Sequence, residues 1–189
     1  MSYIPTLSEA EEILCRYNED PFHIRHAKTV SAVMAYFARE FDPEREEFWA
    51  VVGMLHDLDF ERWPEEHCKK EQQLMTELDL DPALIQACVS HGWGITVDVK
   101  PELTMEKILY ATDELTGLIG AAARMRPSRS VADMELKSLK KKYKTPAFAA
   151  GCSREVIGQG AELLGWELDE LLSRTLDAMK SLPPELRDF

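Results

Sequence analysis

Residues 20–40 read DPFHIRHAKTVSAVMAYFARE and have the pattern of a helix with one buried face. Asp20 is suited to a helix N-cap and Pro21 to the first helical position. Apolar residues then recur every three or four positions, as on the buried face of an amphipathic helix. His26 begins this apolar face, which continues with Val30, Val33 and Phe37. The stretch therefore predicts a helix with a histidine directed into the core.

The Asp-Pro pattern that begins this helix recurs along the chain. The pairs Asp42-Pro43 and Asp81-Pro82 each precede another stretch of helical periodicity. Thr6 with Glu9 forms a capping-box pattern, and Ser130 with Asp133 forms a weaker one. Residues 96–99, the one short β-like run, follow two glycines and are expected to be a loop. The predicted fold is all-α, with helices over 7–18, 21–40, 43–58, 64–78, 82–91, 101–125, 131–143, 153–164 and 168–181.

Length and composition predict one globular domain over residues 1–189. Of the 189 residues, 45% are hydrophobic and 30% charged, which is typical of a folded domain with one sizeable core. There is no internal repeat and no linker rich in Gly, Ser or Pro. Residues 183–189 are expected to form a poorly ordered tail.

Several classes of protein are excluded. No stretch approaches the ~20 apolar residues of a membrane span, and the first residues lack the pattern of a signal peptide, so we expect a cytoplasmic protein. The net charge of -12 argues against general nucleic-acid or anionic-membrane binding. The four cysteines show no C-x-x-C pair, and we expect them to be free thiols in the core.

Charge is unevenly distributed. Residues 124–144 hold eight basic and two acidic side chains, a net charge of +6, which leaves -18 for the rest of the chain. This segment could supply cationic groups to an anionic substrate, or it could be a solvated basic face.

Polar residues interrupt the apolar faces of four predicted helices. They are His26, the pair His56-Asp57, His91 and Asp113. Because buried polar groups need partners, a divalent cation held by imidazole and carboxylate groups is the economical explanation. Gly53, one turn before His56, would let another backbone or a metal-bound group approach closely.

This ordered set resembles the H…HD…D signature of the HD-domain superfamily of metal-dependent phosphohydrolases. The resemblance covers residues 20–126 and implies an HD metal-binding core there, within a compact helical bundle on which C-terminal helices of residues 127–182 pack. His67 and His91 resemble the two extra histidines of members that bind a second metal ion. The resemblance thus implies one or two divalent ions (Mn, Fe, Co, Ni or Zn, with Mg also compatible), held by His26, His56, Asp57, His67, His91 and Asp113.

The activity implied is hydrolysis of a phosphomonoester or phosphodiester bond in a small phosphorylated metabolite or nucleotide. Asp59 and Glu61 are candidate general bases or water-positioning groups. Arg124, Arg126 and Arg129 are candidates to bind the phosphate. Lys28 flanks His26, although helix geometry turns it partly outward, and Trp93 could stack on a base.

Alternatives remain at this point. Six-ligand HD proteins include diiron oxygenases, and a non-catalytic ligand-binding module could retain a metal for stability. His67 could instead be a solvated surface histidine, and Cys88 is more readily explained by core packing than by metal binding. The oligomeric state is left open.

Overall fold

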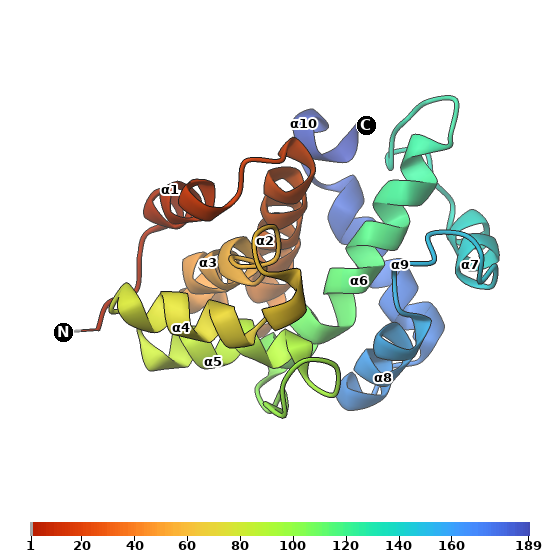
Figure 1. Cartoon of the computed structure of the whole chain (residues 1–189). Helices are drawn as coiled ribbons and strands as arrows, with labels where there is room; N and C mark the ends of the chain where they lie inside the picture. Colours follow the sequence, from red (N-terminus) through yellow and green to blue (C-terminus); the bar gives the residue numbers. More distant parts are fainter. Residues whose placement is uncertain (1) are drawn as a thin grey trace. The chain divides into compact units, whose positions relative to one another are not determined.

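The computed structural model describes residues 2–189 and confirms the all-α class (Figure 1). Within that range no strand forms, and the bridge between Trp93 and Val97 leaves the predicted loop at 96–99 a loop. The chain divides into two compact units, one ending at Leu109 and one beginning at Tyr110. In the described part of the chain, no helix combines the length and hydrophobicity needed to cross a membrane.

Over its described residues, 2–109, the first unit contains five complete helices and three short 3-10 turns. The helices are α1 (Leu7–Tyr17), α2 (Pro21–Phe41), α3 (Glu46–Leu55), α4 (Lys69–Glu77) and α5 (Pro82–Val89). The turns are η1 (Pro43–Arg45), η2 (Pro64–Glu66) and η3 (Ser90–Gly92). Asp20 and Asp81 cap α2 and α5 by accepting backbone N–H bonds, as predicted. Asp42 instead accepts a bond from Trp49 Nε1, and α3 starts only after η1.

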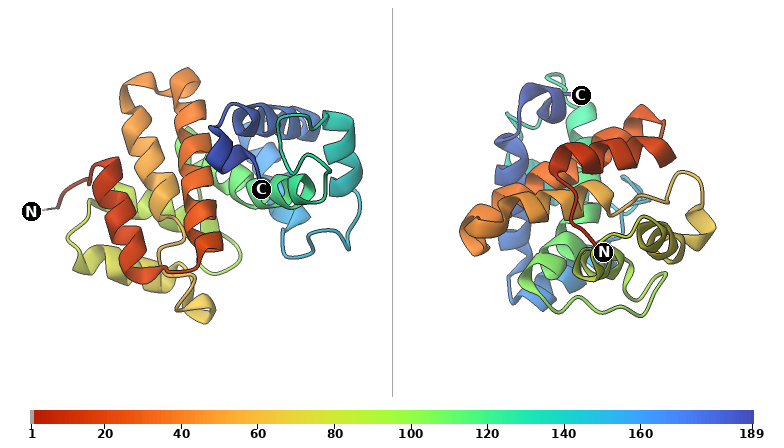
Figure 2. Two further views of the ribbon diagram at one scale, coloured as in Figure 1. Left: turned by 90° about the horizontal axis from the view of Figure 1, so that it is seen from above. Right: turned by 90° about the vertical axis from the view of Figure 1, so that its left-hand side faces the viewer.

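Helices α2 and α3 lie side by side and form the framework of this unit (Figure 2). A Cβ atom at Gly53 would stand 2.7 Å from Ser31 Cα and 2.8 Å from Ser31 N, so only glycine permits this approach. Ser31 Oγ donates a hydrogen bond across the same contact to Ala50 O. The expectation that Gly53 admits another backbone is confirmed.

The second unit continues α6 (Thr104–Arg124), which spans the boundary between the units. Its other helices are α7 (Leu136–Tyr143), α8 (Arg154–Leu164), α9 (Leu168–Lys180) and α10 (Pro184–Arg187). Both α7 and α8 pack on α9, whose buried face includes Leu171, Leu172 and Met179.

Two predictions for the second unit are wrong. Helix α7 begins at Leu136 rather than at 131, because Ser130 caps a turn at Ala132 and bonds Asp188 instead of starting a helix. The predicted poorly ordered tail forms α10, and its end is held by backbone bonds to the loop after α6, including Phe189 N–H to Arg129 O.

Candidate metal centre

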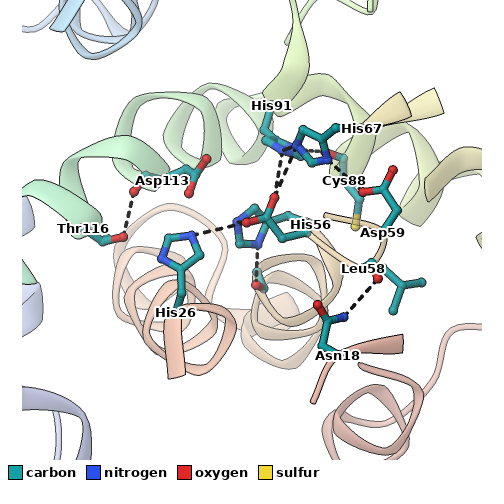
Figure 3. Close-up of polar contacts among 12 residues, drawn as sticks. Asn18, His26, His56, Leu58, Asp59, His67, Cys88, His91, Asp113 and Thr116 are labelled. Carbon is teal, nitrogen blue, oxygen red and sulfur yellow. Dashed lines mark hydrogen bonds and ion pairs between the residues drawn. The ribbon is translucent and has the colours of Figure 1, made fainter. Parts of the chain in front are cut away.

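The first unit brings together four histidines that come from four segments of the chain (Figure 3). His26 lies in α2, and His56 follows the last residue of α3. His67 follows the η2 turn just before α4, and His91 lies in η3 after α5. The prediction that His56 and His91 lie within the α-helices before them is wrong. Helix α3 ends one residue before His56 and α5 ends two residues before His91, and the chain continues in tight turns.

Asp57 lies between the four imidazoles and presents one carboxylate oxygen to each pair. Its Oδ2 atom is 3.6 Å from His26 Nε2 and 3.4 Å from His56 Nε2. The three donor atoms of this group all lie within 4.8 Å of one another. This is a spacing at which one cation could contact all three.

The other oxygen, Oδ1, faces the second pair. It is 3.4 Å from His67 Nε2 and 3.5 Å from His91 Nε2, and these two nitrogens are 3.0 Å apart. The His67 side chain is 12% exposed, so the alternative of a solvated surface histidine is wrong. Asp57 therefore directs one carboxylate oxygen to each of the two histidine pairs.

Three of these imidazoles direct Nε2 to Asp57 because Nδ1 is already engaged. Nδ1 of His56 donates to Gly53 O at 2.9 Å, and Nδ1 of His91 donates to Cys88 O at 2.6 Å. Nδ1 of His67 donates to Asp59 Oδ1 at 2.8 Å. Since carbonyl and carboxylate oxygens only accept, the remaining lone pair of each neutral ring is on Nε2. The rings are thus preset to coordinate a cation through Nε2.

The electrostatics of the cluster favour positive charge at these nitrogens. Burial alone lowers the pKa of His67, but hydrogen bonds with Asp59 and Cys68 raise it to about 9. Burial likewise opposes protonation of His91, and the neighbouring Cys68 and Asp57 raise its pKa well above the usual value. The Nδ1 atoms of His67 and His91 already donate to acceptors. This environment therefore stabilises a cation at Nε2, which can be a proton or a metal ion.

Asp59 and Glu61, the two predicted catalytic groups, are both engaged with the protein itself. Asp59 is buried, and it accepts bonds from His67 Nδ1 and from the backbone N–H of Glu71 at 2.9 Å. Such a carboxylate fixes the orientation of a ligating histidine. Glu61 accepts bonds from the backbone N–H groups of Glu19 and Asp20 and pairs with His23 at 3.1 Å. These contacts favour a positioning role for Asp59 and a structural one for Glu61.

Two buried residues beside the centre were not predicted. Cys68 Sγ lies 3.8 Å from His91 Nε2, and His67, Cys68 and His91 form a second group of donors within 4.8 Å of one another. The neighbouring histidines lower the pKa of the Cys68 thiol to about 6 despite its burial. Glu71 is buried, and among residues 2–189 neither of its carboxylate oxygens has a hydrogen-bond partner; burial raises its pKa well above 4.5. The adjacency of Cys68 to His67 was the available signal for Cys68.

The other thiols have different environments. Cys88 is buried and directs its thiol to Val52 O, so core packing is confirmed for it. All four cysteines are free, as predicted, but Cys15 is exposed and the expectation that it lies in the core is wrong.

The predicted substrate-binding residues lie in varied settings. Lys28 pairs with Glu11 at 2.6 Å, and Trp93 lies in the loop after η3 with Lys100 Nζ 5.5 Å from its ring centre. In the second unit, Arg126 pairs with Asp133 at 3.0 Å, Arg124 lies over the Phe189 ring, and Arg129 is exposed. Four lysines of the basic segment line a groove of about 640 Å³: Lys137, Lys140, Lys141 and Lys144. Asp113, also in the second unit, stays a predicted ligand; its backbone carbonyl accepts a bond from Thr116.

Comparisons with known proteins add no relative. No protein-family model matches the chain, and neither the curated proteins nor the solved structures compared with it give a match. The geometry of the centre is therefore what indicates a function.

Proposed function

We propose that this protein is a metal-dependent hydrolase of phosphoester bonds, acting on a small phosphorylated metabolite or nucleotide. One observation carries the proposal: two pairs of histidine Nε2 atoms face the two oxygens of a single carboxylate, Asp57, at 3.4 to 3.6 Å. A pair of divalent ions held on the two sides of one carboxylate suits hydrolysis of phosphoesters, because such ions activate water and stabilise the attacking and leaving oxygens.

The residues of the chain divide the work of holding such ions. Asp57 would contact both positions, while His26 and His56 would serve one and His67 and His91 the other. Asp59 would keep the His67 ring in place, and Gly53 O would do the same for His56. Because these partners are set before any ligand binds, little reorganisation is needed.

Access for a substrate is best on one side of the centre. The side chains of His26 and Asp57 are 20% and 21% exposed, whereas those of His56 and His91 are 0% and 4% exposed. A phosphate would approach along the side of His26 and Asp57. Phe60, which is partly exposed, packs its ring 5.1 Å from that of His67 and so lies by the less accessible pair.

The test is a reconstitution assay. Protein stripped of metal and loaded with Mn²⁺, Co²⁺ or Mg²⁺ should release phosphate, or cleave a diester, from at least one member of a panel of nucleotides and phosphorylated metabolites. His56→Ala should abolish that activity, and Cys15→Ser, at an exposed thiol outside the centre, should retain it. Loaded protein that cleaves nothing on the panel would contradict the proposal. Iron-loaded protein that instead consumes oxygen when a substrate is added would replace it with the diiron oxygenase.

A further inference from the structure

The Oδ1 side of the centre contains a donor that the histidine pattern does not include. Cys68 is buried, and its Sγ atom is 3.8 Å from His91 Nε2. Around the same point lie His67 Nε2, 3.0 Å from His91 Nε2, and Asp57 Oδ1, 3.4 and 3.5 Å from the two nitrogens. The two imidazole nitrogens therefore share a neighbouring carboxylate oxygen, and a thiol sulfur lies beside them.

These separations match those of a tetrahedral ion. Zinc–nitrogen and zinc–oxygen bonds of about 2.0–2.2 Å and a zinc–sulfur bond of about 2.3 Å place nitrogen and oxygen donors about 3.4 Å apart, and nitrogen and sulfur donors about 3.6 Å apart. The His67–His91 nitrogen separation, the two separations from Asp57 Oδ1 to these nitrogens, and the His91 Nε2–Cys68 Sγ separation lie within about 0.4 Å of those values. Cys68 Sγ lies within 4.8 Å of the donor nitrogen of His67, so a tetrahedral ion would draw the sulfur toward the other donors.

The surrounding backbone is arranged around this sulfur atom. Cys68 has a φ angle of 65°, a left-handed conformation that non-glycine residues rarely adopt. Next to His91, a Cβ atom at Gly92 would stand 2.4 Å from Cys68 Sγ, so the absence of a side chain there leaves the space that the sulfur occupies. Cys88, the other buried thiol, has neither feature and points to a backbone carbonyl.

From this geometry we infer that Cys68 is a ligand, and that His67, His91, Cys68 and Asp57 form a thiolate-containing site for a borderline or soft divalent ion. The site would take Zn²⁺, Co²⁺ or Fe²⁺ and would discriminate against Mg²⁺, which prefers oxygen donors. The inference concerns the same centre as the proposed function, but it does not depend on hydrolysis of any substrate.

Cobalt provides a direct test, because a thiolate bound to Co²⁺ gives a charge-transfer absorption band in the near ultraviolet that imidazole and carboxylate ligands do not give. The full chain is titrated with Co²⁺ alone, and with Zn²⁺ in competition. We expect the band in the wild-type protein and in the controls Cys15→Ser and Cys88→Ala, and its loss in Cys68→Ser. Removing a group that only orients a metal ligand weakens metal binding roughly 10–100-fold. Cys68→Ser removes the ligand itself, so it should weaken Zn²⁺ binding on this side by at least about 100-fold.

The outcomes separate the two proposals. Wild-type protein that binds cobalt without the band overturns ligation by Cys68 and leaves the metal centre of the proposed function in place. A band that persists in Cys68→Ser also overturns it. Wild-type protein that binds no metal contradicts both proposals. Since the wild-type band is read on the unmutated chain, poor folding of Cys68→Ser cannot obscure the result.

Discussion

The two sides of Asp57 differ in chemistry and in burial. On the Oδ2 side, His26 and His56 offer imidazole nitrogens, and the His26 side chain is 20% exposed. On the Oδ1 side, His67, His91 and Cys68 are buried or nearly so, and the two imidazoles are oriented by Asp59 and by the carbonyl of Cys88. Under the two proposals, the Oδ2 side would be the more open position, suited to substrate and an exchangeable ion, and the Oδ1 side would be an enclosed, softer position suited to a retained ion.

The largest expected effect comes from removing what the two sides share. Asp57→Ala should eliminate binding of both ions and lower hydrolytic activity by about 10³-fold or more, because bound ions supply several kcal/mol of transition-state stabilisation. Elemental analysis and the reconstitution assay measure the two effects. Retention of both ions in Asp57→Ala would show that the carboxylate does not bridge them.

A second pair of variants separates the two sides. His56→Ala should lose the ion on the Oδ2 side, and His91→Ala the ion on the Oδ1 side, so each variant should retain about one ion per chain where the wild type binds two. Metal content after dialysis against a weak chelator is the measurement. If either variant loses both ions, the two positions are not independent and the comparison fails.

A smaller effect is expected from the carboxylate behind His67. Asp59→Asn keeps the size of the side chain but weakens its hydrogen bond with Nδ1, and should lower affinity on the Oδ1 side by roughly 10–100-fold with little change on the Oδ2 side. Glu61→Gln is the matched control and should leave both affinities unchanged, since Glu61 bonds backbone N–H groups and His23. Equal effects of the two substitutions would reject the positioning role of Asp59.

The smallest expected effect concerns Glu71 and its dependence on pH. Burial raises the pKa of this carboxyl above its ordinary value of 4.5, so above about pH 4.5 the folded chain keeps a proton that the unfolded chain releases. The contribution of Glu71 to the free energy of unfolding is therefore present at low pH and falls as the pH rises above that value. The free energy of unfolding of Glu71→Gln, relative to that of the wild type, should therefore rise by about 1–3 kcal/mol between pH 4 and pH 8. Urea denaturation of both proteins at the two pH values measures this difference, and a constant difference would contradict the protonated state.

Much of the fold could be predicted because its signals are local. Asp-Pro pairs cap α2 and α5, and apolar stripes at helical spacing mark the buried faces, so most helix ends are predicted within a few residues. Where a side chain finds a distant partner, the prediction is wrong. Ser130 bonds Asp188, 58 residues away, and no local pattern near Ser130 indicates this.

In the candidate site too, some features follow from local sequence patterns and others depend on distant contacts. The positions of His26, His56, Asp57 and His91 follow from residue types on apolar faces. The partners of Nδ1 and the contacts of Asp59 and Cys68 depend on how loops meet after folding. From the sequence, a cysteine followed by Lys69 and Lys70 indicates the start of a solvated helix. The left-handed backbone at Cys68 is also contrary to the local preference of that residue.

Gly53 carries a consequence for how this sequence can change. A single methyl group at that position would clash with α2 and force α2 and α3 apart. It would stand 2.7 to 2.9 Å from backbone atoms of Val30 and Ser31, which cannot rotate away. This clash would move α2, which carries His26, relative to the end of α3, which precedes His56. Position 53 is therefore closed to every other amino acid, although it contributes no side chain to the chemistry, and mutational scanning should find it as intolerant as the histidines themselves.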